Sequence, residues 1–170
     1  MGPITVQIEI DVPRELAYDF IADLANRPAF TAPYHSAYHL ERIDSTGVGA
    51  SVRFRTTPGG TWMTSEIAEL QPPHRILERG RGGRLNRVPT VTVWELVEQP
   101  GGATRVSLTF LTRPERFFDQ LAERLARATR GHRRGWQASL HRLREVLEGP
   151  AGATPRVRVA GGNRHRTGVA

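Results

Sequence analysis

Two tyrosine–histidine pairs, Tyr34–His35 and Tyr38–His39, follow one another at a spacing of four residues. On an α-helix, His35 and His39 would share a face and could ligate one metal ion. Pro33 directly before the pairs, and the strand-forming residues after them, predict an extended strand instead. There the two imidazoles are roughly 13 Å apart, which is too far to bind one ion. The pattern therefore predicts no metal site.

On a strand, alternate side chains point to opposite faces, which places the two tyrosines on one face and the two histidines on the other. Leu40 shares the face of Tyr34 and Tyr38. We therefore expect the tyrosines to form a cavity wall, with their hydroxyls as polar contacts for a ligand, and His35 and His39 to face solvent. The alternative places all four rings on the surface, at the mouth of the fold.

Three glutamates, Glu66, Glu69 and Glu78, are the acids nearest to the expected cavity. A carboxyl group in an apolar pocket has a raised pKa and could act as a general acid or base. The alternative, which we favour, is a carboxylate on the outer face of its strand, paired with a neighbouring arginine. No catalytic residue is therefore assigned, and none of these positions indicates a cofactor.

The composition fits one domain of 170 residues and excludes several kinds of site. No cysteine is present, which excludes disulfides, iron–sulfur clusters and thiolate zinc sites. There is no apolar run of about 18 residues and no secretory signal, so we expect a cytoplasmic protein without membrane insertion.

The net charge is +7, and all the basic residues other than histidine are arginines. Residues 149–170 hold four of them and no acid, so residues 1–148 carry 7 − 4, or +3. This basic tail raises nucleic acid as a partner. RNA binding on a sheet, however, requires exposed aromatic residues, and the outward strand positions are mostly Arg, Glu, Ser and Thr. Nucleic acid is therefore not expected as a partner.

The chain divides into a strand, two short helices, six further strands and a long helix. The first strand, 4–12, alternates apolar and polar residues. The helices begin near Pro13, and Pro28 and Pro33 interrupt them. The later strands are predicted at 36–43, 49–57, 61–70, 74–80, 87–98 and 104–112, and an amphipathic helix at 114–148. We expect residues 1–148 to form the domain and 149–170 to be a disordered basic tail.

This order predicts an α+β fold in which a seven-stranded antiparallel sheet curves around the C-terminal helix. One helix is too narrow to cover such a sheet, so an internal cavity should remain between them. Parity along the strands and spacing along the helix select the cavity-lining residues, although Met63 and Ile67 compete with Trp62 for the inward side. The predicted set is Tyr34, Tyr38, Phe54, Trp62, Trp94, Phe110, Phe118 and Trp136. Gly131 and Gly135 in the helix are expected to leave room for a ligand or for another backbone.

Five segments carry a resemblance to a known family: ITVQIEIDVPRELAYDFIADLANRPAF (4–30), GVGASVRFR (47–55), EIAELQPPHRILERG (66–80), GGATRVSLTF (101–110) and WQASLHRLREVLE (136–148). In order and spacing they resemble the START-like helix-grip superfamily, specifically its polyketide cyclase/dehydrase and coenzyme Q-binding branch (SRPBCC proteins). The resemblance implies a helix-grip fold holding a small or lipid-like apolar molecule. No catalytic signature of any one branch is present.

Three functions remain open on the sequence. The first is a binder of an apolar, lipid- or polyketide-like small molecule, acting as a monomer or homodimer. The second is a cyclase/dehydrase-type enzyme that uses the same cavity. The third is a module that receives a protein partner in its groove. Two or more converging polar groups inside the cavity would favour an enzyme, and an evenly apolar lining would favour a carrier. A closed or collapsed interior with an exposed apolar patch would favour the partner module.

Overall fold

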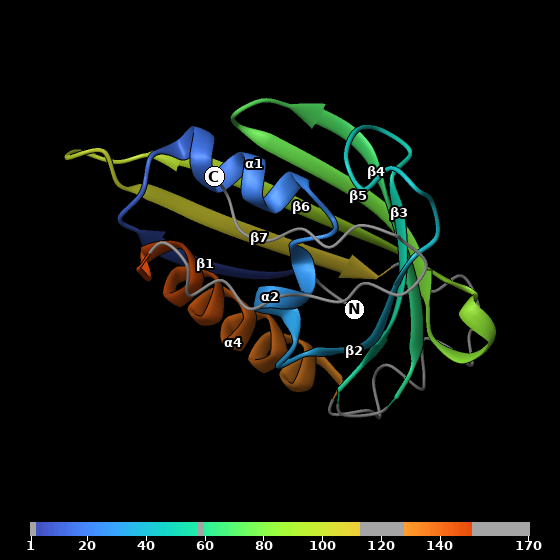
Figure 1. Cartoon of the computed structure of the whole chain (residues 1–170). Helices are drawn as coiled ribbons and strands as arrows, with labels where there is room; N and C mark the ends of the chain where they lie inside the picture. Colours follow the sequence, from blue (N-terminus) through green and yellow to red (C-terminus); the bar gives the residue numbers. More distant parts are fainter. Residues whose placement is uncertain (1–2, 58–59, 113–127, 151–170) are drawn as a thin grey trace.

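The computed structural model describes residues 3–57, 60–112 and 128–150 (Figure 1). Its elements, in chain order, are β1 (Ile4–Ile10), α1 (Arg14–Ala22), α2 (Arg27–Thr31), β2 (His35–Leu40), β3 (Ser51–Thr56), β4 (Trp62–Gln71), β5 (Arg75–Gly82), η1 (Arg84–Asn86), β6 (Val88–Glu98), β7 (Thr104–Thr112) and α4 (Ala128–Glu148). Residues 114–127 of the predicted long helix, with Phe118, and most of the predicted tail lie outside the described residues.

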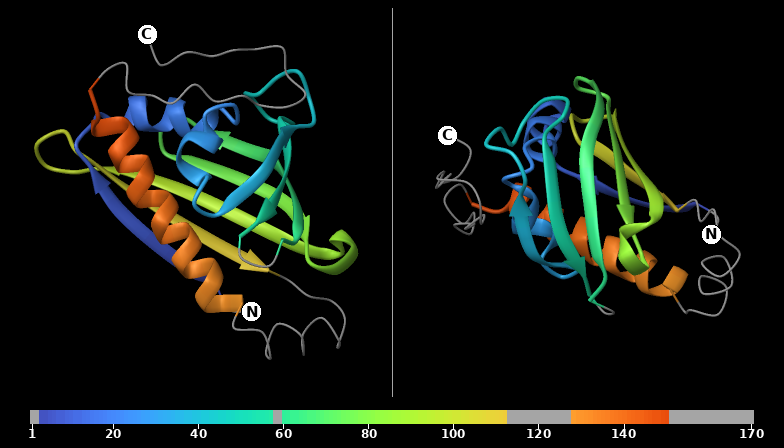
Figure 2. Two further views of the ribbon diagram at one scale, coloured as in Figure 1. Left: turned by 60° about the horizontal axis from the view of Figure 1, so that its bottom comes forward. Right: turned by 90° about the vertical axis from the view of Figure 1, so that its right-hand side faces the viewer.

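The seven strands form one antiparallel sheet in the order β1-β7-β6-β5-β4-β3-β2. The sheet curves, and α4 lies along its concave side together with α1 and α2 (Figure 2). Helix α4 contacts both β1 and α2. This arrangement confirms the predicted helix-grip fold, with two short helices between the first and second strands.

Alternation along the strands explains why one face of the sheet is buried. In β1, Ile4, Val6, Ile8 and Ile10 are buried, whereas the residues between them are exposed. Burying each such side chain contributes about 1.5–3 kcal/mol. β7 pairs with β1 in register and repeats the pattern, so these strands supply one wall of the core against α4.

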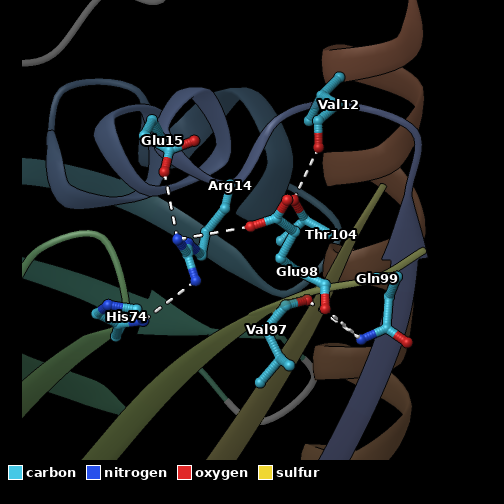
Figure 3. Close-up of polar contacts among 8 residues, drawn as sticks. All are labelled: Val12, Arg14, Glu15, His74, Val97, Glu98, Gln99 and Thr104. Atoms are coloured by element: carbon cyan, nitrogen blue, oxygen red, sulfur yellow. Dashed lines mark hydrogen bonds and ion pairs between the residues drawn. The ribbon is translucent and has the colours of Figure 1, made fainter. Parts of the chain in front are cut away.

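The start of α1 is attached to the ends of β5 and β6 by Arg14 (Figure 3). The guanidinium lies 3.4 Å from Glu15 Oε1, 3.7 Å from Glu98 Oε2 and 3.3 Å from His74 Nδ1. Close by, the hydroxyl of Thr104 donates to the carbonyl of Val12 at 2.7 Å, which fixes the chain between β1 and α1 (Figure 3). Both acids are largely exposed, so these pairs orient the helix more than they stabilise it.

Candidate functional site

A cavity lies between the concave face of the sheet and the helices α2 and α4. The space left by its walls is small, about 20 Å³ for the centre of a water molecule, which is enough to hold a water. A larger molecule therefore enters only if side chains of the wall move. The lining residues come from the helices α2 and α4, from six strands, β2 to β7, and from the connections that hold Leu24 and Tyr34. They are Leu24, Arg27, Thr31, Tyr34, His35, Tyr38, Val52, Phe54, Met63, Thr64, Ser65, Glu78, Thr90, Thr92, Phe110 and Trp136.

Aromatic rings make up much of the wall. His35 stacks on Phe54 with a centroid distance of 3.9 Å. Trp136 meets the rings of Tyr34 and His35 edge-on, at 5.1 Å in each case, and Phe110 at 6.1 Å. Such a wall offers flat apolar surfaces on several sides, which suits a flat ligand.

Tyr34 closes the cavity against α4. Its hydroxyl is hydrogen-bonded to Nδ1 of His132, and its ring lies directly on Gly135. A Cβ atom at Gly135 would overlap that ring, whereas a Cβ at Gly131 would meet no atom of the described residues within 4 Å. Gly135 is therefore the glycine that allows a close approach, and what approaches it is the wall of the cavity itself.

Tyr38 lines the neighbouring part of the cavity, and its hydroxyl donates to the carbonyl of Leu24 at 3.0 Å. Burial raises the pKa of Tyr38 above its usual value, and burial does the same for the pKa of Tyr34. Both phenols therefore remain protonated at neutral pH. The predicted inward placement of the two tyrosines agrees with where the structure puts their rings.

The predicted outward placement of His35 is wrong. His35 is only 8% exposed and lines the cavity, whereas His39 is exposed as predicted. The cause is an irregularity in β2, where the pairing with β3 shifts between Ser36 and His39 and Ala37 has a φ of 48°. One extra residue reverses the alternation, so that His35 and Tyr38 point to the same side.

Neither ring nitrogen of His35 has a hydrogen-bond partner within the described part of the chain. Burial, with smaller effects of the nearby Arg27 and His132 charges, lowers the pKa of His35 to about 3. The imidazole is therefore neutral at physiological pH. A neutral imidazole offers one N–H donor and one acceptor nitrogen.

A buried ion pair between Arg27 and Glu78 forms the polar end of the cavity. Arg27 Nη2 lies 2.6 Å from Glu78 Oε1, and both side chains are almost completely buried. The indole of Trp94 donates to the same oxygen at 2.8 Å, and Ser65 donates to Glu78 Oε2 at 2.8 Å. Arg27 Nε donates to the carbonyl of Ile21 at 2.8 Å. Both oxygens of the Glu78 carboxylate therefore accept hydrogen bonds. A buried ion pair is stable only when its remaining polar atoms are satisfied in this way.

The outward placement favoured for Glu78 is therefore wrong, while Glu66 is exposed and Glu69 is partly so. Arg27 is not among the residues predicted from the sequence. A signal for it was present, because Arg27 occupies helical spacing between Leu24 and Phe30, within an otherwise apolar stripe. A charge on an apolar stripe requires a buried partner.

The other predicted lining residues fall into four groups, the last of which is Trp62 on the outer face. Phe54, Phe110 and Trp136 line the cavity, and so do Thr90 and Thr92 of β6. Trp94 is completely buried behind the wall, where its ring lies 4.6 Å beneath the Arg27 guanidinium. Phe118 is outside the described residues.

The predicted inward placement of Trp62 is wrong. Pairing of β3 with β4 sets Phe54 opposite Met63 and Arg55 opposite Trp62, so Met63 takes the inward side. Trp62 instead lies on the outer face, with the Arg53 guanidinium 4.4 Å from its ring centroid.

Over the described residues, no group of three His, Cys, Asp or Glu side chains could hold a metal ion. Within the same ranges no helix is both long and apolar enough to cross a membrane.

A family model described as polyketide cyclase / dehydrase and lipid transport matches residues 1–148. No curated protein sequence matches the chain. Among solved structures, the chain resembles DynU16, a protein of the dynemicin biosynthetic locus, with 19% identity and a TM-score of 0.58 over 88% of this chain. That match covers 48% of DynU16, so the chain spans about half of its length.

Two further structures match along most of both chains. TTHA0849 from Thermus thermophilus is 18% identical with a TM-score of 0.64, covering 85% of this chain and 95% of that one. The major latex-like protein 151 of Panax ginseng is 13% identical with a TM-score of 0.65, covering 84% and 95%. At these identities the likeness shows a shared fold.

Proposed function

Because the chain belongs to the polyketide cyclase / dehydrase and lipid transport family, we propose that it binds a small, largely apolar organic molecule in the cavity beneath α4. The observation that carries the proposal is the ring-lined cavity, whose wall combines aromatic faces with a few buried polar groups. Pockets of this composition hold ligands by apolar contact and orient them by a few hydrogen bonds.

The small free volume of the cavity means that binding requires a side chain of the wall to move. Because the walls leave room for little more than a water, a ligand displaces a ring before it is enclosed. Tyr34 is the natural candidate, since it belongs to the turn between α2 and β2 and is attached to α4 through His132. Its movement would join the cavity to the space over Gly135.

The test uses the neutral dye N-phenyl-1-naphthylamine, whose fluorescence rises in an apolar site. We expect saturable uptake of one dye per chain. Thr92 lines the cavity on β6, and Thr109 lies on the outer side of β7, so Thr92→Leu and Thr109→Leu add the same volume inside and outside. Thr92→Leu should weaken uptake at least about fivefold, a loss of about 1 kcal/mol, and Thr109→Leu should not change it. Absence of saturable uptake by the wild-type protein would overturn the proposal.

A second candidate, a cyclase/dehydrase-type enzyme, is favoured by one observation. The polar groups of Arg27, Glu78 and His35 converge on one cavity, whereas a simple carrier would have an evenly apolar lining. The N–H of the neutral imidazole could hydrogen-bond to a substrate carbonyl and stabilise the enolate that forms as the chain cyclises. The test is the rate at which a linear β-polyketone cyclises with the wild-type protein, with His35→Phe, and with the outward control His39→Phe. Equal rates in all three, matching the rate without protein, would exclude this activity.

A further inference from the structure

Two polar side chains of the cavity lack hydrogen-bond partners among the described residues. They are His35, at both ring nitrogens, and Trp136, at its indole Nε1. The residues are 8% and 4% exposed, and both line the cavity. Their rings are in edge-to-face contact at 5.1 Å, so the two side chains border the same part of the cavity.

The charged groups and the phenols of the cavity wall are already bonded within the protein. Glu78 accepts from Arg27, Trp94 and Ser65. Tyr38 donates to the carbonyl of Leu24, and Tyr34 is bonded to His132. Leaving a buried donor or acceptor unpaired costs stability, so natural structures retain such groups mainly where a ligand or water uses them.

We propose that His35 and Trp136 recognise the polar substituent of the ligand, and that this substituent is a hydroxyl group on a flat ring. The inference rests on the proposed function, because it names the class of molecule that the same cavity takes. The hydroxyl oxygen accepts the N–H of Trp136, and the hydroxyl hydrogen is donated to the acceptor nitrogen of His35. An indole donates only, whereas one nitrogen of a neutral imidazole accepts, so a single hydroxyl can pair with the indole N–H and with that nitrogen at once.

Other substituents fit these two side chains less well. A ketone or an ether would accept from Trp136 but would leave the acceptor nitrogen of His35 unpaired. A carboxylate or an ammonium group would bring an uncompensated charge into the cavity, because Arg27 and Glu78, the charged residues among the described lining, already pair with each other. The lowered pKa of His35 keeps the imidazole neutral and therefore able to accept.

Three single-ring compounds of similar shape test the inference: 4-methylphenol, 4-methylanisole and p-xylene. They carry a hydroxyl, an ether oxygen that only accepts, and a methyl group. Binding is followed through the three indole N–H signals in ¹⁵N-resolved NMR spectra, which correspond to the three tryptophans of the chain. The Trp136 signal is assigned by its loss in Trp136→Phe.

The wild-type protein should bind 4-methylphenol about three- to tenfold more tightly than 4-methylanisole, the factor typical of one hydrogen bond. Both oxygen compounds should shift the Trp136 indole proton downfield, and p-xylene should not. In His35→Phe the preference of 4-methylphenol over 4-methylanisole should disappear, while His39→Phe, which changes the exposed histidine, should retain it.

Equal affinity of the wild-type protein for all three compounds would overturn the inference and leave the proposed function standing. The inference would also be overturned if the chemical shift of the Trp136 indole proton were the same with the two oxygen compounds as with p-xylene. If none of the three binds but N-phenyl-1-naphthylamine does, the inference fails and the function stands; if the dye also fails to bind, both fail. Because the ranking is measured on the wild-type protein, it holds even if His35→Phe does not fold.

Discussion

The cavity side and the solvent side of the sheet contain the same residue types in nearly the same geometry. On the outer face, the guanidinium of Arg53 lies 4.4 Å from the ring centroid of Trp62, and on the inner face that of Arg27 lies 4.6 Å from Trp94. The outer arginine is exposed, whereas Arg27 is buried against Glu78. Because the distances are alike, the difference in burial decides how much each contact contributes to the free energy of unfolding.

The comparison extends to the histidines and the glycines. His35 is enclosed by rings, and His39, four residues along, is exposed. The ring of Tyr34 lies directly on Gly135. Around Gly131, one turn earlier on α4, no atom of the described residues lies within 4 Å of where a Cβ would be. In each pair of arginines, histidines or glycines, the same substitution can be made once at the cavity and once away from it, and the two effects compared.

The largest difference is expected for the arginines. Arg27→Met leaves Glu78 buried without its cation and should lower the free energy of unfolding by about 3–5 kcal/mol. Urea denaturation measures the loss. The double variant Arg27→Met with Glu78→Leu should recover much of it, because it removes the unpaired charge. A loss below about 1 kcal/mol for the single variant would contradict the claim that burial makes the loss of one partner of this pair strongly destabilising.

Replacing each glycine with alanine should change the free energy of unfolding in opposite directions at Gly135 and Gly131. Gly135→Ala forces its methyl group against the Tyr34 ring and should cost about 1–3 kcal/mol, despite the better helix propensity of alanine. Gly131→Ala meets no atom of the described residues within 4 Å and should gain up to about 1 kcal/mol. Thermal unfolding of both variants checks this. Stabilisation by Gly135→Ala would show that Tyr34 leaves its position at no cost.

The histidines should differ in their response to acid. Because the pKa of His35 is lowered to about 3 in the folded protein, the unfolded chain binds a proton below about pH 6.5 that the folded state does not. Stability from this group is complete above that pH and falls by about 1.4 kcal/mol for each pH unit on the way toward 3.

Urea denaturation at pH 7, 6 and 5 compares the wild-type protein with His35→Phe, in which that slope should be smaller. The charged and titratable groups beside His35, namely Arg27, Glu78 and His132, are common to both proteins, so the difference isolates the imidazole. His39→Phe should keep the wild-type slope. Parallel slopes for wild type and His35→Phe would mean that His35 is protonated in the folded state.

The smallest effect is expected on the outer face. Arg53→Met removes an exposed cation from the Trp62 ring and should cost less than about 1 kcal/mol, a fraction of the cost of Arg27→Met. It should leave dye uptake unchanged, since neither Arg53 nor Trp62 lines the cavity. A cost similar to that of Arg27→Met would remove the distinction between the two faces.

Much of the fold follows from local patterns in the sequence. Alternation in β1 and in β7 places their apolar side chains on one face, and the turn residues between strands separate them well enough to count seven. Inward positions on regular strands, such as Phe54 and Phe110, were predictable for the same reason. The alternation of side chains along a strand is enough to predict which residues point inward, provided that the strand has no bulge.

The rest of the site depends on information that local patterns do not contain. His35 faces inward because Ala37 adopts a positive φ, which an alternating pattern cannot indicate for an alanine. Trp62 and Met63 were both plausible inward residues until the pairing with β3 selected one. Arg27 and Glu78 meet across 51 residues of sequence, and only the tertiary fold brings them together.

The irregularity at Ala37 has a consequence for how copies of this protein meet one another. Strand β2 is an outer strand of the sheet, and such an edge is a template on which a strand of a second molecule can add. A bulge bends and twists the strand that contains it, so an incoming chain finds a short and uneven row of backbone groups. The residue that turns His35 into the cavity therefore also makes this edge a poor site for aggregation.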